Sequence, residues 1–320
     1  MKEQKIYREW NLLFLHERLQ TRSLKSNRRL VWFLVKIFLI FFLLTSCTRQ
    51  TSNDNVLAAV SIPPQAWFVS QIAGNKADVL ILVPAGQNPH NYEPTPRQIQ
   101  ALSKANVWIL SGAEFEITLR PKIEKLFPNL LIIDGTQGVK FRLLEDHDHD
   151  GTDHDHSSLE IDRHTWLGRE PAKTMAAFVT IALLGNDSGN VNYYYQRYTD
   201  VIDGIDAVFN EFQTTLAPLK GKSVFVYHPS FGYFLDDFGI IQEAVETGGK
   251  EPTARQLNSL MEKINAEKPA AIFVQTQFPV SAAKTLADSV GAQVIELDPL
   301  AQDWLENIKH MGQTLKNIIQ

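Results

Sequence analysis

The sequence predicts an α/β fold of two lobes, each with a mainly parallel sheet flanked by helices, joined by a long rigid linking helix. Two patterns carry this prediction. Short apolar runs rich in Val, Ile and Leu, typical of buried strands, alternate with segments at helical spacing. The runs also form two groups, one ending near Ile133 and the other beginning at Val224, with a long amphipathic segment between them.

Seven apolar runs are expected to be strands, because each is short and rich in β-branched or other apolar residues. They are Val56–Val60, Val79–Val83, Val107–Leu110, Leu130–Ile133, Val224–Tyr227, Ala271–Val274 and Val294–Leu297. Helical spacing is visible in Pro96–Ala105 and in Ala254–Ala266. Strands that alternate with helices in this way favour largely parallel sheets.

Two further helices are expected between the groups of strands. Pro171–Leu184 begins with a proline, which helices accept in their first turn. In Val191–Leu216, apolar side chains such as Tyr194, Val201 and Ile205 recur at helical spacing. At 1.5 Å per residue this second helix would be about 39 Å long, which is enough to brace two lobes.

The N-terminal residues are typical of a bacterial secretion signal. Basic residues up to Arg29 precede the apolar run Leu30–Leu44. This run is shorter than the ~20 residues that span a bilayer, and it fits the apolar region of a signal peptide. It ends in Leu-Thr-Ser-Cys47, which resembles a lipobox, so Cys47 is the expected lipidation site. The alternative is an uncleaved membrane anchor with an incidental cysteine.

These features divide the chain into five parts. They are a signal peptide of the lipoprotein type (1–46), a polar tether (47–55), an N-terminal α/β lobe (56–187), the linking helix (188–217) and a C-terminal α/β lobe (218–320). The N-terminal lobe includes a loop rich in His and Asp over residues 145–158. Acyl chains on Cys47 would attach the protein to a lipid membrane on its extracytoplasmic side.

Charge and cysteine content exclude several classes of function. From position 47 on, the chain has 22 basic and 33 acidic residues. This acidic balance argues against nucleic acid as a partner and suits a protein that meets cations. Cys47 is the single cysteine of the sequence, which rules out an internal disulfide framework and a multi-cysteine zinc finger.

Three widely spaced histidines and one aspartate are candidate metal ligands. His90, His228 and Asp298 each come shortly after an expected strand, and His164 precedes the first of the two central helices. Open α/β sheets bind ligands at the carboxyl ends of their strands. Each half of the chain supplies two of the four residues, so one metal ion could bind in a cleft between the lobes.

The ligand chemistry of these four residues fits zinc. Zinc takes about four ligands, and imidazole nitrogens with a carboxylate oxygen suit it. A more oxygen-rich set would suit Mn²⁺ better. A loop histidine taken alone is usually a surface residue that makes an ordinary hydrogen bond, so spacing alone leaves the metal site open.

Five motifs resemble those of one known family. They are GQNPHNYEP (Gly86–Pro94), HTW (His164–Trp166), YHPSFGYF (Tyr227–Phe234), EPT (Glu251–Thr253) and LDPL (Leu297–Leu300). From Val56 to the C-terminus, the chain resembles the ZnuA-like (cluster A-I) solute-binding proteins of zinc and manganese ABC importers. This resemblance implies two α/β lobes braced by a long helix. It also implies metal ligands at the matching positions His90, His164, His228 and Asp298.

The resemblance further implies the ion, the partners and the location. Zinc-selective members tend to have His where many manganese members have Glu, so His228 favours Zn²⁺, with Mn²⁺ as the alternative. The expected partners are an ABC permease and its ATPase subunit, and the protein is expected to be a monomer. It would be an extracytoplasmic lipoprotein, periplasmic or on the cell surface, and not an enzyme.

Two further groups of residues are weaker candidates. The loop histidines His147, His149, His154 and His156 resemble the loop of zinc-specific members and could collect metal, although such stretches are usually solvated linkers. A histidine ligand usually donates its second N–H to a carboxylate or carbonyl. Of the nearby acids Glu114 and Glu116, we take Glu116 as the candidate for that role, with a surface or structural acid as the alternative.

Three other functions stay open at this point. A zinc hydrolase would need an open coordination position, as would arise if Asp298 were not a ligand. No H-E-x-x-H motif or nucleophile elbow supports that hypothesis. A manganese or iron importer subunit differs only in its ion. An adhesin role could coexist with transport.

Overall fold

The computed structural model describes residues 55–144, 161–246, 254–278, 284, 287–288 and 291–319. The described residues from Val56 onward belong to one compact unit. The expected signal peptide, Cys47, and the loop with His147, His149, His154 and His156 lie outside the described residues. None of the helices described has both the length and the apolar character needed to cross a membrane.

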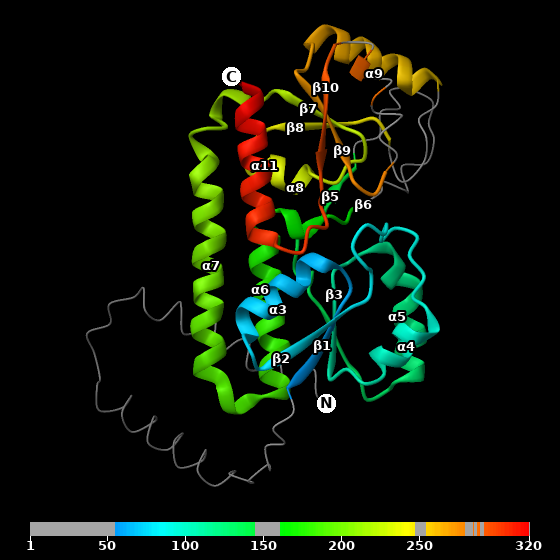
Figure 1. Ribbon diagram of the computed structural model, residues 1–320, viewed down its shortest axis with the longest axis vertical. Coiled ribbons are helices and arrows are strands. Elements are labelled where there is room, and N and C mark those ends of the chain that lie inside the picture. Colours follow the sequence, from blue (N-terminus) through cyan, green and yellow to red (C-terminus); the bar gives the residue numbers. More distant parts are fainter. Residues whose placement is uncertain are drawn as a thin grey trace, which may run out of the picture. The chain divides into compact units, whose positions relative to one another are not determined.

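The first half of this unit contains a parallel sheet with the strand order β2-β1-β3-β4 (Figure 1). Its strands are β1 (Val56–Val60), β2 (Ala77–Ile81), β3 (Val107–Leu110) and β4 (Leu131–Asp134). Each strand returns parallel to its neighbour, and the connections carry α3 (Pro63–Ala73), α4 (Pro96–Leu102) and α5 (Glu114–Leu126). Because β1 and β3 are flanked on both sides, their residues are almost entirely buried.

The second half repeats this arrangement. Its parallel sheet has the order β10-β9-β7-β8, with β7 (Ser223–Val226), β8 (Ile241–Ala244), β9 (Ala271–Gln275) and β10 (Gln293–Leu297). The helices α8 (Gly232–Asp236) and α9 (Ala254–Glu267) lie in its connections. In both sheets the first strand is flanked by the second and the third. The expected fold of two parallel α/β lobes is confirmed.

Within the two parallel sheets, the largest differences from the expected strands occur at sheet edges. The strand β2 begins at Ala77 rather than at Val79, and β8 was not expected at all. Both are the outermost strands of their described sheets, where one side of the backbone has no neighbouring strand and polar side chains are tolerated. The sequence of β8, IQEA, therefore lacks the apolar run by which the central strands were found.

Two long helices lie between the two sheets in the chain. They are α6 (Arg169–Asn186) and α7 (Val191–Gln213), joined by the short 3₁₀ turn Ser188–Asn190. The helix α7 ends three residues before the expected Leu216, and a 3₁₀ turn follows at Ala217–Leu219. Pro218 lies in this 3₁₀ turn, and it could not continue the α-helix because it has no backbone N–H to donate.

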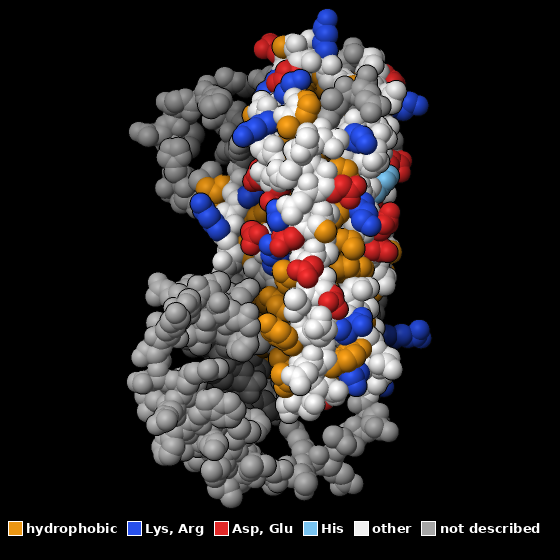
Figure 2. All heavy atoms as spheres, turned by 90° about the vertical axis from the view of Figure 1, so that its left-hand side faces the viewer, with side chains coloured by type: hydrophobic (Ala, Val, Ile, Leu, Met, Phe, Trp, Pro, Cys, Tyr) orange, Lys and Arg blue, Asp and Glu red, His pale blue; other side chains and the backbone are white. Residues whose placement is uncertain are grey.

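The helix α7 links the two halves. It packs against α3 and α6 of the first half and against the C-terminal helix α11 (Trp304–Ile319) of the second, as Figure 1 shows. Its buried stripe contains Tyr194, Val201, Ile205, Val208, Phe209 and Phe212. Figure 2 shows acidic and basic side chains distributed over the face that carries α7. The helix therefore has the amphipathic character that its sequence predicts.

A two-stranded antiparallel hairpin precedes α6. It consists of β5 (Arg142–Leu143) and β6 (Ile161–Asp162), with Leu143 opposite Ile161. The predicted loop 145–158 lies between these two strands in the sequence. After β6 the chain passes through the 3₁₀ turn η1 (Thr165–Leu167) into α6.

The contact between α11 and α7 depends on a glycine. A Cβ atom placed at Gly312 would lie 2.5 Å from the ring of Phe212. We therefore expect Gly312→Ala to lower the free energy of unfolding by about 1–2 kcal/mol, because overpacking outweighs the helix propensity gained. The matched control is Gly204→Ala on α7, where no atom lies within 4 Å of the added Cβ. It should raise stability by up to about 1 kcal/mol. If urea unfolding gave the same change in the free energy of unfolding for both substitutions, this would contradict the close packing at Gly312.

Candidate metal site

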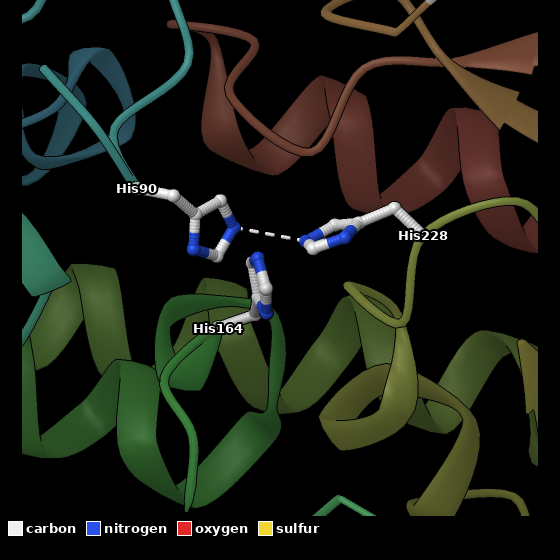
Figure 3. A group of neighbouring side chains, drawn as sticks. All are labelled: His90, His164 and His228. Carbon is white, nitrogen blue, oxygen red and sulfur yellow. Dashed lines mark hydrogen bonds between the residues drawn. The ribbon is translucent and has the colours of Figure 1, made fainter. Parts of the chain in front are cut away.

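Three of the predicted ligands come together where the two halves of the unit meet. His90 lies in the loop between β2 and α4, and His164 lies directly before η1. His228 follows the carboxyl end of β7, in the second half. Figure 3 shows the three imidazole rings turned toward one another. One ligand atom from each ring lies within 4.8 Å of the other two.

The ring nitrogens approach closely. His90 Nε2 and His228 Nε2 are 2.9 Å apart, and the centroids of the His164 ring and the other two rings are 5.3 and 5.2 Å apart. In a tetrahedral zinc site with Zn–N bonds of about 2.0–2.1 Å, the ligand nitrogens are about 3.4 Å apart. Small side-chain shifts would therefore convert the observed group into such a site.

A carboxylate lies behind each of the three rings. His90 Nδ1 is 3.0 Å from Glu114 Oε2, His164 Nδ1 is 2.9 Å from Asp162 Oδ1, and His228 Nδ1 is 2.6 Å from Glu246 Oε2. An ionised carboxylate only accepts hydrogen bonds, so each Nδ1 is assigned the proton, and each Nε2 would present a lone pair to a bound metal ion. This tautomer is the one that binds a metal through Nε2.

The carboxylates are positioned by the ends of secondary-structure elements. Glu114 begins α5, directly after the loop that follows β3. Glu246 follows β8, and its backbone N–H donates to Tyr227 O, which places it beside His228. Asp162 also accepts the backbone N–H of His164. Parallel strands bring Glu114 and Glu246 to the carboxyl edges of their sheets, whereas Asp162 ends β6 of the antiparallel hairpin.

Burial gives the three histidines different environments. His228 and His164 are buried, whereas the side chain of His90 is 23% exposed. Burial lowers the pKa of His228 to about 4, although the hydrogen bond to Glu246 opposes this shift. Burial would raise the pKa of Glu114, but the hydrogen bond and positive charge of His90 outweigh it and lower that pKa.

The acid beside His90 is Glu114 and not the expected Glu116. Glu116 is buried and accepts hydrogen bonds from Ser111 N, Ser111 Oγ and Gly112 N, at 2.7, 2.7 and 2.8 Å. It thus stabilises the turn between β3 and α5. This is the role of a structural acid, which was the alternative interpretation of Glu116. Residues two apart on a helix point about 200° apart around its axis, so the two acids cannot both face His90. Glu114 is further held by Arg163, whose Nε lies 3.6 Å from Glu114 Oε1.

Asp298 lies beyond the carboxyl end of β10, as expected, but outside the group of three histidines. Its Oδ1 accepts hydrogen bonds from Gln277 Nε2, at 2.7 Å, and from Leu300 N, at 2.9 Å. The side chain of Asn307 donates to its backbone carbonyl. Hydrogen bonds thus hold both the side chain and the backbone of Asp298, and its role as a ligand stays a prediction.

Three further side chains hold the segments that carry His228 and His164. Gln275, at the end of β9, accepts from His228 N at 3.1 Å and donates to His228 O and to Ser230 Oγ. Near His164, the indole of Trp166 donates to Pro299 O at 2.8 Å, and the indole of Trp304 donates to Trp166 O at 2.6 Å. The segment that carries His164 is thus tied to the second half of the unit.

A family model matches most of the sequence of this chain. The model described as zinc-uptake complex component A, periplasmic (ZnuA) matches residues 59–318. The chain belongs to the ZnuA family. The match includes the three grouped histidines, their carboxylate partners and Asp298.

Curated ZnuA-family relatives differ in the ion that their names give. The zinc-binding lipoprotein AdcA of Streptococcus pneumoniae serotype 4 is 26% identical over 270 residues, which are 80% of this chain and 52% of AdcA. ZnuA of Bacillus subtilis, a high-affinity zinc uptake protein, is 24% identical over 80% of this chain and 82% of its own. PsaA of Streptococcus anginosus, a manganese ABC transporter substrate-binding lipoprotein, is 24% identical over 89% of this chain and 95% of its own. The chain spans about half the length of the AdcA relatives.

Solved structures of the ZnuA family share the fold. A crystal structure of ZnuA has a TM-score of 0.76 and 32% identity, and covers 83% of this chain and 100% of its own. TroA of Treponema pallidum, a periplasmic zinc-binding protein, has a TM-score of 0.72 and 20% identity, and the match covers 83% of this chain and 99% of TroA. The second likeness supports the fold alone.

The different contacts of Glu114 and Glu116 lead to a paired prediction. Glu114→Ala should weaken metal binding about tenfold to hundredfold, because His90 loses the acceptor that orients its ring. Glu116→Ala should instead lower the free energy of unfolding by about 1–3 kcal/mol, because buried N–H groups lose their acceptor. Metal titration and urea unfolding of both variants measure the two effects. A larger loss of affinity in Glu116→Ala would reverse our assignment.

The pH dependence of metal affinity should reflect the buried state of His228. Metal competes with protons for imidazole, so affinity falls as the pH falls. His228 has a pKa lowered to about 4, so it is neutral between about pH 5 and 7 and exchanges no proton there. The logarithm of the apparent affinity should therefore change by at most two per pH unit in that range. Chelator competition at several pH values measures this slope. A slope of three in that range would mean that His228 also exchanges a proton there.

Proposed function

We propose that this chain is the extracytoplasmic substrate-binding protein of an ABC importer, and that it captures Zn²⁺ and delivers it to the membrane permease. The observation that supports this most directly is the group of three imidazoles, each with a carboxylate at Nδ1 and with the Nε2 atoms of His90 and His228 in contact. The family and the names of its relatives support the class of function.

The donor set favours zinc over manganese. Three neutral imidazoles are nitrogen donors, which zinc prefers, whereas manganese sites are richer in oxygen. The carboxylates Glu114, Asp162 and Glu246 offset the charge of the ion from outside its coordination sphere. The relative PsaA, whose name assigns manganese, keeps a manganese importer subunit as the second candidate.

We propose Asp298 as the fourth ligand. It follows β10 and is held by Gln277 and Asn307 near the three histidines. A carboxylate oxygen would complete a tetrahedral set and leave no position for an activated water, which argues against a zinc hydrolase. The members of this family are solute-binding components of transporters, and capture and release of the ion need no catalysis.

The remaining parts of the proposal concern location and partners. Cys47 would carry the acyl chains that anchor the protein to the membrane, in line with the lipoprotein names of several relatives. The loop histidines 147, 149, 154 and 156 would act as a weak auxiliary collector of metal. A monomer would dock on the permease, whose ATPase subunit drives import.

A competitive titration tests the ion and the site together. Zn²⁺ is titrated against a chromophoric chelator, with Mn²⁺ as competitor, for the wild type, His228→Ala and His310→Ala. We expect one tight zinc site that is insensitive to Mn²⁺, weakened at least a hundredfold (~3 kcal/mol) in His228→Ala because a direct ligand is lost. His310, exposed on α11, is the control and should change nothing.

Other outcomes of this titration have definite meanings. Preference for Mn²⁺ would replace the zinc importer by the manganese candidate. An unchanged affinity in His228→Ala would show that the three-histidine site is wrong. Asp298→Ala tests the fourth ligand separately, and an unchanged zinc affinity would remove it from the set.

A further inference from the structure

The hairpin before α6 joins the site to the second half through one arginine. Arg142 lies on β5 of the first half, and its guanidinium contacts Asp236 at the end of α8 in the second. Arg142 Nε donates to Asp236 Oδ2 at 2.5 Å and Nη2 donates to Asp236 Oδ1 at 3.3 Å. This is the two-pronged geometry that distinguishes arginine from lysine at carboxylates.

The same guanidinium also contacts the carboxylate that orients His164. Arg142 Nη1 donates to Asp162 Oδ2 at 2.9 Å, while Asp162 Oδ1 accepts both the backbone N–H and Nδ1 of His164. Arg142 and His164 thus use opposite oxygens of one fully buried carboxylate. Burial would raise the pKa of Asp162, but His164 and Arg142 outweigh it and lower that pKa. Two bonds to fixed partners leave this carboxylate little freedom to rotate.

The first residue of α8 provides the space for this contact. A Cβ atom at Gly232 would lie 1.9 Å from Arg142 Nη1 and 3.0 Å from Asp162 Oδ2. No side chain fits there unless the guanidinium moves. The next residue completes the contact, because the Tyr233 hydroxyl accepts from Arg142 N at 2.9 Å and donates to Asp162 O at 3.0 Å.

We propose that Arg142 is a positioning residue for the metal ligand His164: seated over Gly232, it fixes Asp162 and so sets the direction of the His164 imidazole relative to the half that supplies His228. This rests on the proposed function, because it takes the three histidines to be the zinc site. It adds a residue outside the ligand set and its carboxylates. The effect passes through Asp162, so it weakens binding without removing a ligand.

The contacts of Arg142 with Asp236 and with Asp162 should contribute unequally to zinc affinity. Asp236 is half exposed, and ion pairs at such positions are screened by water and contribute little. Asp162 is excluded from solvent, so water cannot replace the hydrogen bond from Arg142 when that bond is lost. We therefore expect Asp236→Asn to change zinc affinity by less than threefold, and Arg142→Gln to weaken it about tenfold to hundredfold, as for other groups that orient histidine ligands.

The test compares substitutions that remove the same contact from its two sides. Zinc affinity is measured for the wild type, Arg142→Gln, Arg142→Lys, Gly232→Ala and the double variant Arg142→Gln/Gly232→Ala, with Arg120→Gln as a control on the exposed face of α5. Arg142→Lys should recover part of the loss. Gly232→Ala alone should weaken binding to a similar extent, and the double variant should be little worse than either single variant.

A second readout separates positioning from a loss of fold. In ¹⁵N-edited spectra of the zinc-loaded protein, the Nδ1–H proton of His164 should be protected from exchange in the wild type and exchange faster in Gly232→Ala. Thermal unfolding of the metal-free variants identifies any that do not fold. If Arg142→Gln does not, Arg142→Lys and Gly232→Ala decide the question.

The outcomes distinguish this inference from the proposed function. Absence of tight zinc binding by the wild type would overturn the function. Tight binding by the wild type, with affinities in folded Arg142→Gln and Gly232→Ala within twofold of it, would overturn the role of Arg142 alone. Fully additive losses in the double variant would also overturn it, because the two substitutions would then act through separate contacts.

Discussion

The site depends on three hydrogen bonds between an imidazole Nδ1 and a carboxylate. A histidine ring can rotate and can carry its proton on either nitrogen, so sequence position alone does not make it a ligand. Glu114, Asp162 and Glu246 fix both properties for the three rings. Each acid is held by the end of a strand or the start of a helix. The parallel sheets therefore place Glu114 and Glu246, and the antiparallel hairpin places Asp162.

The three rings differ in how firmly the fold holds them. His90 is the most exposed of the three rings and lies in a loop, whereas His164 and His228 are buried. The His164 segment is fastened to the second half through the indoles of Trp166 and Trp304. The helix α7 packs on both halves as well. An entering ion would thus meet two nearly fixed rings and one that has room to adjust.

The sequence predicted the strands whose apolar runs are uninterrupted. It predicted the three histidines mainly through motifs that resemble those of ZnuA-like proteins, and two of them, His90 and His228, come after such strands. It did not reveal β8, whose polar sequence suits an edge strand, and so it did not reveal Glu246 either. Glu246 is 18 residues from His228, and only the pairing of β7 with β8 brings the two together. For Glu116 the structural alternative holds, because the exact start of the helix α5 places Glu114 beside His90 and turns Glu116 toward Ser111.

The hairpin of β5 and β6 has a consequence for the segment that it closes. Leu143 and Ile161 are paired across the hairpin, so the two ends of the segment between them lie at neighbouring points. The entropic cost of closing such a loop grows only with the logarithm of its length. Residues can thus be added or removed between these two positions at small thermodynamic cost, while Arg142 and Asp162 keep their places.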